Sequence, residues 1–250
     1  MLVRQGKARG EAVDQKLAGI LAGIAGAINT AAFASVGFFS ANMTGNVSLL
    51  SDHIATANFR TSAFFLAVVA SFIGGSAAST LLVNFGKRQN CHAIYAYNVL
   101  IEGLLLGILG AADPCLPLVL RGPILIVGLS FLMGLQNAVV TQISGARVRT
   151  THVSGLATDL GIGLAMLFET SQGKETIEMG RHYVSKLRLH GVTICSFLFG
   201  GVVGVLLYRA VGGMLFLAAA GVLSSLATVE IFRAKRLVQQ QAGSFPFDKR

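Results

Sequence analysis

The stretch LAGILAGIAGAINTAAFASVGFFSANMTGNVSLLS, residues 17–51, carries no ionised side chain anywhere between Lys16 and Asp52. A helix needs about 20 mainly apolar residues to cross the roughly 30 Å of hydrocarbon in a bilayer. The first part of the stretch is apolar over that length, whereas its second part, around ANMTGN, is more polar. We therefore predict a membrane-spanning helix followed by a change of structure.

The rest of the chain is similarly apolar. Hydrophobic residues make up 53% of the sequence and charged residues 12%, and the mean hydropathy is +0.67. In soluble domains about a quarter of the residues are charged. The sequence therefore predicts an all-α membrane protein with about six crossings, over Leu17–Phe38, Thr61–Phe85, Ala93–Ala112, Leu118–Val140, Leu189–Tyr208 and Gly212–Phe232.

The formal net charge of +9 follows the positive-inside rule. With six crossings and a cytoplasmic N-terminus, all Lys and Arg residues lie inside except Arg60, Arg121 and Arg209. Topology thus accounts for the basic charge, and we expect no nucleic acid among the partners. The sequence predicts a cytoplasmic segment over residues 1–16, one membrane domain over 17–234, and a cytoplasmic tail over 235–250.

Short stretches recur in the same order in the two halves of the membrane domain. GAIN (26–29) resembles GLQN (134–137), and SFIGG (71–75) resembles SFLFGG (196–201). Each half holds an odd number of predicted crossings, so a true repeat enters the membrane from the opposite face, as in many secondary transporters. We predict two inverted three-helix repeats, over about 17–112 and 118–232; the alternative is chance similarity among small and apolar residues.

Two shorter segments, Asn42–Asn58 and Thr151–Phe168, are too short or too polar to be clear crossings. They are either amphipathic helices at the interface or broken, re-entrant helices that dip in from opposite faces. If both crossed fully, the chain would have eight crossings, which fits the charge bias less well.

The segments share a Thr/Ser-Gly pair, Thr44-Gly45 and Ser154-Gly155. Here we expect the glycine to allow a chain break and the hydroxyl to cap the following helix, whose free N–H groups favour anions. The alternative is a cap with no further role. The candidate substrate-binding residues are Asn29, Asn42, Thr44, Gly45, Asn46, Gln136, Asn137, Ser154, Gly155 and Asp159.

Glu102 lies within the predicted crossing 93–112, with 13 uncharged residues before it and 10 after it. An ionised carboxylate without a partner is costly in hydrocarbon. We predict a proton-coupling role for Glu102, with a structural hydrogen bond as the alternative.

These motifs resemble the YoaK-like family of uncharacterised bacterial integral membrane proteins, a domain of unknown function. The resemblance rests on GAIN (26–29), FFSANMTGNVSLL (38–50), GLQNAVV (134–140) and VRTTHVSGLATDLG (148–161). Family members commonly carry an acidic residue where this chain has Asn29. The resemblance implies a multi-pass protein of the bacterial inner membrane and supplies no substrate.

We expect a secondary transporter or permease for a small polar solute, with anions among the candidates, and we expect the lipid bilayer and such a solute as partners. No catalytic pair, phosphate-binding loop or metal-ligand spacing occurs, so we expect no enzyme, no cofactor and no metal. The alternatives are a non-transporting helper of a larger membrane complex and, with less support, a lipid-modifying enzyme. The glycine-rich faces also allow a homo-oligomer.

Overall fold

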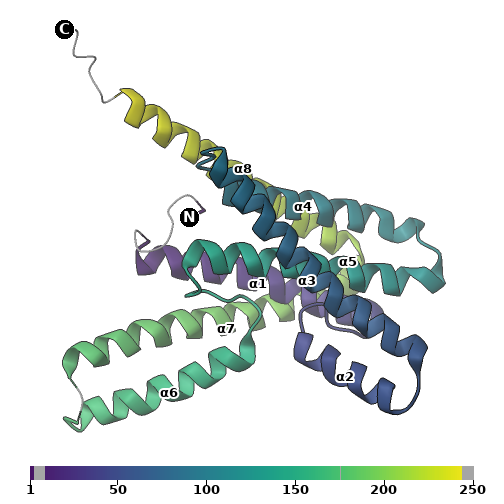
Figure 1. The fold of residues 1–250 in the computed structure, drawn as a ribbon, viewed down its shortest axis with the longest axis horizontal. Helices are drawn as coiled ribbons and strands as arrows, with labels where there is room; N and C mark the ends of the chain where they lie inside the picture. The colour runs from purple at the N-terminus through teal and green to yellow at the C-terminus, as the bar shows by residue number, and fades with distance from the viewer. Residues whose placement is uncertain (3–8, 175, 244–250) are drawn as a thin grey trace.

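The computed structural model describes residues 1–2, 9–174 and 176–243, which form a bundle of helices without a β-strand in these ranges (Figure 1). The prediction of an all-α fold is confirmed. The elements are α1 (Glu11–Val36), α2 (Met43–Ala55), α3 (Phe59–Arg88), α4 (Ile94–Ala112), the short 3-10 turn η2 (Asp113–Cys115), α5 (Leu118–Ser144), α6 (Val153–Ser171), α7 (Ile177–Val211) and α8 (Met214–Gly243).

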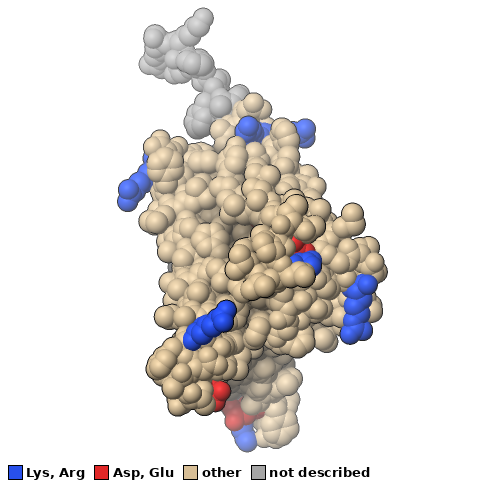
Figure 2. Space-filling model, turned by 90° about the vertical axis from the view of Figure 1, so that its right-hand side faces the viewer, with Lys and Arg blue, Asp and Glu red and all other residues tan. Residues whose placement is uncertain are grey.

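In the described ranges, seven helices are long and apolar enough to cross a membrane, which is typical of a multi-pass membrane protein. Six of them coincide with the predicted crossings, apart from one or two residues at the ends of three crossings, and the seventh is α6, with 19 residues. Helix α2 has 13 residues and spans about 20 Å, less than the hydrocarbon thickness. Figure 2 shows few, scattered charges on one face of the molecule.

Several helices are longer than the predicted crossings. Helix α1 begins at Glu11, so residues 11–16 belong to it, and α8 continues to Gly243, so residues 235–243 are helical. The remaining part of the predicted tail, 244–250, lies outside the described residues. Hydropathy marks the part of a helix that suits hydrocarbon, whereas Glu, Lys and Arg extend helices readily beyond it.

The helices of the first half pack mainly against those of the second half. Helix α1 packs against α7, α3 against α5, and α4 against α8, whereas α2 packs on α3 and α6 on α7 (Figure 1).

Glycines bring the α1–α7 and α3–α5 pairs into backbone contact. A Cβ added at any of five glycines would lie less than 3.0 Å from a carbonyl oxygen of the partner helix, so only glycine fits there. The five contacts are Gly26 with Phe197, Gly134 with Phe72, Gly75 with Phe131, Gly200 with Gly23, and Gly204 with Ala27. Each of the first four contacts includes a glycine of GAIN, GLQN, SFIGG or SFLFGG.

Irregular links precede the two shorter helices. Gly37 caps the end of α1 and Gly145 caps the end of α5, both in the left-handed conformation with φ of 80° and 62°, which glycine adopts without steric cost. The chain then runs through residues 38–42 to α2 and through residues 146–152 to α6. The predicted breaks therefore lie before the helices, and α2 and α6 are themselves continuous.

Candidate functional site

The first turns of α2 and α6 line one shared cavity of about 730 Å³. In Figure 1 the two helices run in opposite directions away from this region. The lining residues come from α1, α3, α7, both links and both short helices: Asn29, Thr30, Phe39, Ala41, Asn42, Met43, Thr44, Gly45, Ser48, Phe72, Thr151, His152, Val153, Ser154 and Phe197.

At the start of α2, Asn42 is the capping residue. Its side-chain oxygen accepts a hydrogen bond from the Gly45 N–H at 3.1 Å, and its carbonyl accepts one from the Asn46 N–H. The prediction that Thr44 caps this helix is therefore wrong, because the helix begins one residue before it. Gly45 lies in the first turn rather than at a chain break. The N–H groups of Met43 and Thr44 precede any intrahelical acceptor.

At the start of α6, His152 occupies the capping position and makes no side-chain capping bond. Ser154 is the second residue of the helix, so the prediction that it caps α6 is also wrong. Gly155 is helical and no chain break occurs there. Only from Leu156 onward does an N–H find a carbonyl acceptor, that of His152. This first turn therefore presents the N–H groups of Val153, Ser154 and Gly155.

Asn29 and Asn137 hold the two links in place. The side-chain oxygen of Asn29, which is 6% exposed, accepts a bond from the Ala41 N–H at 2.9 Å. The side-chain oxygen of Asn137 accepts bonds from the hydroxyls of Thr150 and Thr151 at 3.2 and 3.0 Å. Each asparagine is thus bonded to the link that follows its own helix, and sets where the next helix begins.

The cavity favours negative charge. Two helix N-termini point their partial positive charge at it, and no Asp or Glu is among its lining residues. The imidazole of His152 also lines the cavity, where it can hydrogen-bond a solute.

Three phenylalanines and further hydroxyls complete the wall and were not among the predicted site residues. Phe39, Phe72 and Phe197 give it an apolar part, and Thr30, Ser48 and Thr151 carry hydroxyls. Phe72 and Phe197 stand at matching places in SFIGG and SFLFGG, so the repeat was a signal that could have pointed to them.

The structure brings only part of the predicted set to the cavity. Asn29, Asn42, Thr44, Gly45 and Ser154 line it. Asn46 is buried and directs its amide toward the Phe39 carbonyl, and Gln136 donates to the Leu21 carbonyl of α1. Neither Gly155 nor Asn137 reaches the wall, and Asp159 lines a different cavity.

Glu102 also lies elsewhere, on α4, which packs against α8. Its side chain is fully buried, and neither carboxylate oxygen has a hydrogen-bond partner among the described residues. Asn98, one turn earlier on α4, is bonded to Ser79 of α3. Glu102 is thus a buried carboxyl group that is not a lining residue of the cavity between α2 and α6.

Potential metal ligands do not gather in the described part of the chain, which has no group of three His, Cys, Asp or Glu placed to hold an ion. A comparison with curated proteins and one with solved structures each give no match. A family model described as "Protein of unknown function (DUF1275)" matches residues 17–229. The chain therefore belongs to the DUF1275 family, in agreement with its resemblance to uncharacterised membrane proteins.

Proposed function

We propose that this protein is a secondary transporter or permease for a small anion in the bacterial inner membrane. The observation that carries the proposal is the cavity shared by the first turns of α2 and α6, one from each half of the chain. Helices whose N-termini meet in the membrane interior are how several transporter folds bind anionic groups.

Inverted repeats are part of the proposal, and the packing supports them. An inverted repeat makes α1 equivalent to α5 and α3 equivalent to α7. Exchanging the two halves then turns the contact between α1 and α7 into the contact between α5 and α3. Four of the five glycine contacts obey this exchange: Gly26 meets Phe197 as Gly134 meets Phe72, and Gly200 meets Gly23 as Gly75 meets Phe131. The links obey it too, since Asn29 and Asn137 each hold the link that follows.

In this arrangement α2 and α6 are re-entrant and enter from opposite faces, while the other six long helices cross. Irregular backbone at membrane depth is tolerated where protein or a water-filled cavity satisfies it, and the links at 37–42 and 145–152 border such a cavity. Both termini then lie in the cytoplasm under the positive-inside rule.

The chemistry of the cavity wall narrows the class of solute that we propose. Unpaired helix N–H groups and the hydroxyls of Thr44 and Ser154 can donate hydrogen bonds, and the lining residues carry no carboxylate that would repel an anion. The phenylalanines suit an apolar body. We therefore propose a small organic or inorganic anion.

The proposal is tested by uptake into liposomes that contain the purified protein. The probes are nitrate, phosphate, methanesulfonate and benzenesulfonate, which stay ionised and do not cross a bilayer unaided, with neutral benzenesulfonamide as the matched control. We expect saturable uptake of at least one anion and no protein-dependent uptake of the sulfonamide. If none of the four anions shows saturable uptake and the protein instead co-purifies stably with a partner protein, the result would favour the non-transporting helper.

A further inference from the structure

A second cavity, of about 570 Å³, lies near the N-terminal end of α1. It is bordered by the first turns of α1, the link before α6, α6 itself and the first half of α7. Its lining is rich in charged and polar side chains: Glu11, Asp14, Gln15, Ala146, Arg147, Arg149, Leu156, Asp159, His182, Ser185, Lys186, Leu189 and His190. Leu156 lies two residues after Ser154 in α6, so this cavity begins close to the first one.

His190 is the buried polar group of this cavity. It is 6% exposed, and its Nδ1 atom has no hydrogen-bond partner among the described residues. Nδ1 lies 3.8 Å from the Oδ2 atom of Asp159, whose side chain is about half exposed. This distance is about 1 Å too long for a hydrogen bond, so a small approach of α6 to α7 closes the pair.

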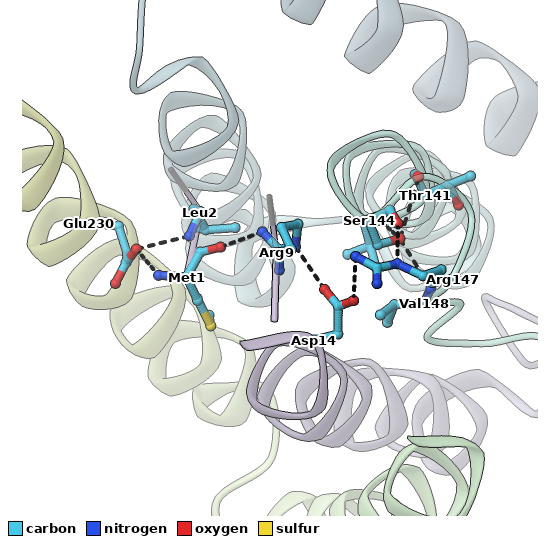
Figure 3. A network of polar contacts seen from close by, with 10 residues as sticks. Met1, Leu2, Arg9, Asp14, Thr141, Ser144, Arg147, Val148 and Glu230 are labelled. Atoms are coloured by element: carbon cyan, nitrogen blue, oxygen red, sulfur yellow. Dashed lines mark hydrogen bonds and ion pairs between the residues drawn. The ribbon is translucent and has the colours of Figure 1, made fainter. Parts of the chain in front are cut away.

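The other acids of the cavity are differently placed. Asp14 on α1 is already bonded to Arg9 and Arg147, at 2.7 and 2.9 Å (Figure 3). Glu11 lies at the start of α1. The further charged or titratable groups that face His190 across the cavity are Arg149 on the link and His182 and Lys186 on α7 itself. Among the cavity's acids, the one that forms a close pair with His190 is Asp159.

Packing alone does not require this pair, as the first half of the chain shows. With Gly45 aligned to Gly155 and Ser71 to Ser196, the positions of Asp159 and His190 correspond to Leu49 and Phe65. Phe65 is buried among Phe38, Phe64 and His53. The two corresponding positions therefore carry apolar side chains in one half and an acid and an imidazole in the other.

Few residues of helix α6 are buried, so α6 can move relative to α7 when the interaction between Asp159 and His190 changes. Of its 19 residues only Leu156 and Gly163 are buried, with Gly163 against Leu187 of α7. Ser154 of the first cavity and Asp159 of the second are five residues apart, about 7.5 Å along the helix axis. A change in the distance between Asp159 and His190 therefore moves the first turn that lines the proposed anion site.

We infer that Asp159 and His190 form a proton-binding pair that couples protons to the movement of α6. A proton from cavity water binds Nδ1 of His190, and the resulting imidazolium attracts the Asp159 carboxylate and draws α6 toward α7. Loss of the proton to water restores the neutral imidazole and releases the helix. The link to anion transport rests on the proposed function, whereas the proton-driven movement does not. The pair takes the role that the sequence suggested for Glu102, which lines neither of the two cavities.

The movement is measured without any solute. The full chain contains no Trp, so a Val184→Trp substitution on α7 quenches a bimane dye attached at Leu164→Cys on α6; both side chains are exposed. Cys91, Cys115 and Cys195 are replaced by alanine. In nanodiscs we expect one sigmoidal change of fluorescence between about pH 5 and 8, where imidazoles titrate.

The matched variant carries Asp159→Leu and His190→Phe, the residue types at the corresponding positions 49 and 65 of the first half, and is expected to fold and to show a flat titration. Glu102→Gln is expected to leave the sigmoid unchanged. Three results would overturn the inference. The parent protein could show a flat titration, the double variant could keep the sigmoid, or only Glu102→Gln could remove it. A lack of anion uptake with an intact sigmoid would count against the proposed function alone.

Discussion

Replacing Gly75 by leucine is expected to abolish the folded bundle, whereas the same replacement at the neighbouring Gly74 leaves it intact. A Cβ at Gly75 would lie less than 3.0 Å from the carbonyl oxygen of Phe131 and 2.8 Å from its carbonyl carbon. Those are backbone atoms of α5, so α3 and α5 would have to separate. Overpacking of a core commonly costs about 1–3 kcal/mol, and a backbone clash along a helix pair is expected to exceed that range.

Gly74 is the matched control because a Cβ there meets no atom within 4 Å. The measurement is the yield of monodisperse protein after detergent extraction, together with the thermal unfolding midpoint of whatever is recovered. We expect Gly75→Leu to give aggregate and Gly74→Leu to match the parent protein. Equal yields and midpoints for the two variants would contradict the close packing of α3 on α5.

Substituting Val153 by proline is expected to weaken anion binding by about tenfold or more. Val153 is the first residue of α6, where proline is well tolerated and removes only the backbone N–H. A hydrogen bond to a charged group is worth about 1.5–3 kcal/mol, and each 1.4 kcal/mol is a factor of about ten in affinity. Met43→Pro removes the equivalent N–H from α2, so the double variant should bind more weakly still.

Val153→Ala is the control, because it shortens the side chain and keeps the N–H. The apparent affinity for a transported anion, benzenesulfonate if it is among those taken up, is measured in the liposome assay. Alanine is expected to behave nearly as the parent protein does. If proline and alanine at this position gave the same affinity, the helix start would not be the anion-binding group.

The crossings were predictable because each depends on a local property. A run of apolar residues without charge predicts a spanning helix whatever it packs against, and each of the six predicted runs overlaps one helix, with at most two of its residues outside that helix. The 19-residue helix α6 was left open because Asp159 and the polar residues around Ser154 lower its hydropathy, and only tertiary structure places Asp159 beside His190.

The candidate site was predicted less completely, for a physical reason. The Thr/Ser-Gly pairs marked the right two segments, yet the capping residues proved to be Asn42 and His152. Helix starts depend on how the preceding link is held, and here Asn29 and Asn137 hold those links through long-range hydrogen bonds. Gln136, by contrast, was predicted as a site residue, yet its side chain donates a hydrogen bond from α5 to the Leu21 carbonyl of α1.

The cavity walls supplied by Phe72 and Phe197 could be anticipated only from the repeat. Each is an ordinary apolar residue of a predicted crossing, and hydropathy gives no reason to assign it to a site. Their matching places beside the glycine contacts were the available signal.

The most direct test of the account is whether the starts of α2 and α6 meet. Thr44→Cys and Ser154→Cys are introduced together into a chain whose Cys91, Cys115 and Cys195 are alanine, with a protease site in the link at residues 89–93. A bifunctional thiol reagent that reaches across the cavity of about 730 Å³ is applied before cleavage. The account predicts that the two fragments stay joined on a denaturing gel, and that they separate when the cysteines are placed at Ala55 and Ser171, the far ends of the two helices. Fragments that separate with Thr44→Cys and Ser154→Cys, or stay joined with the far-end pair, would contradict a shared site between α2 and α6.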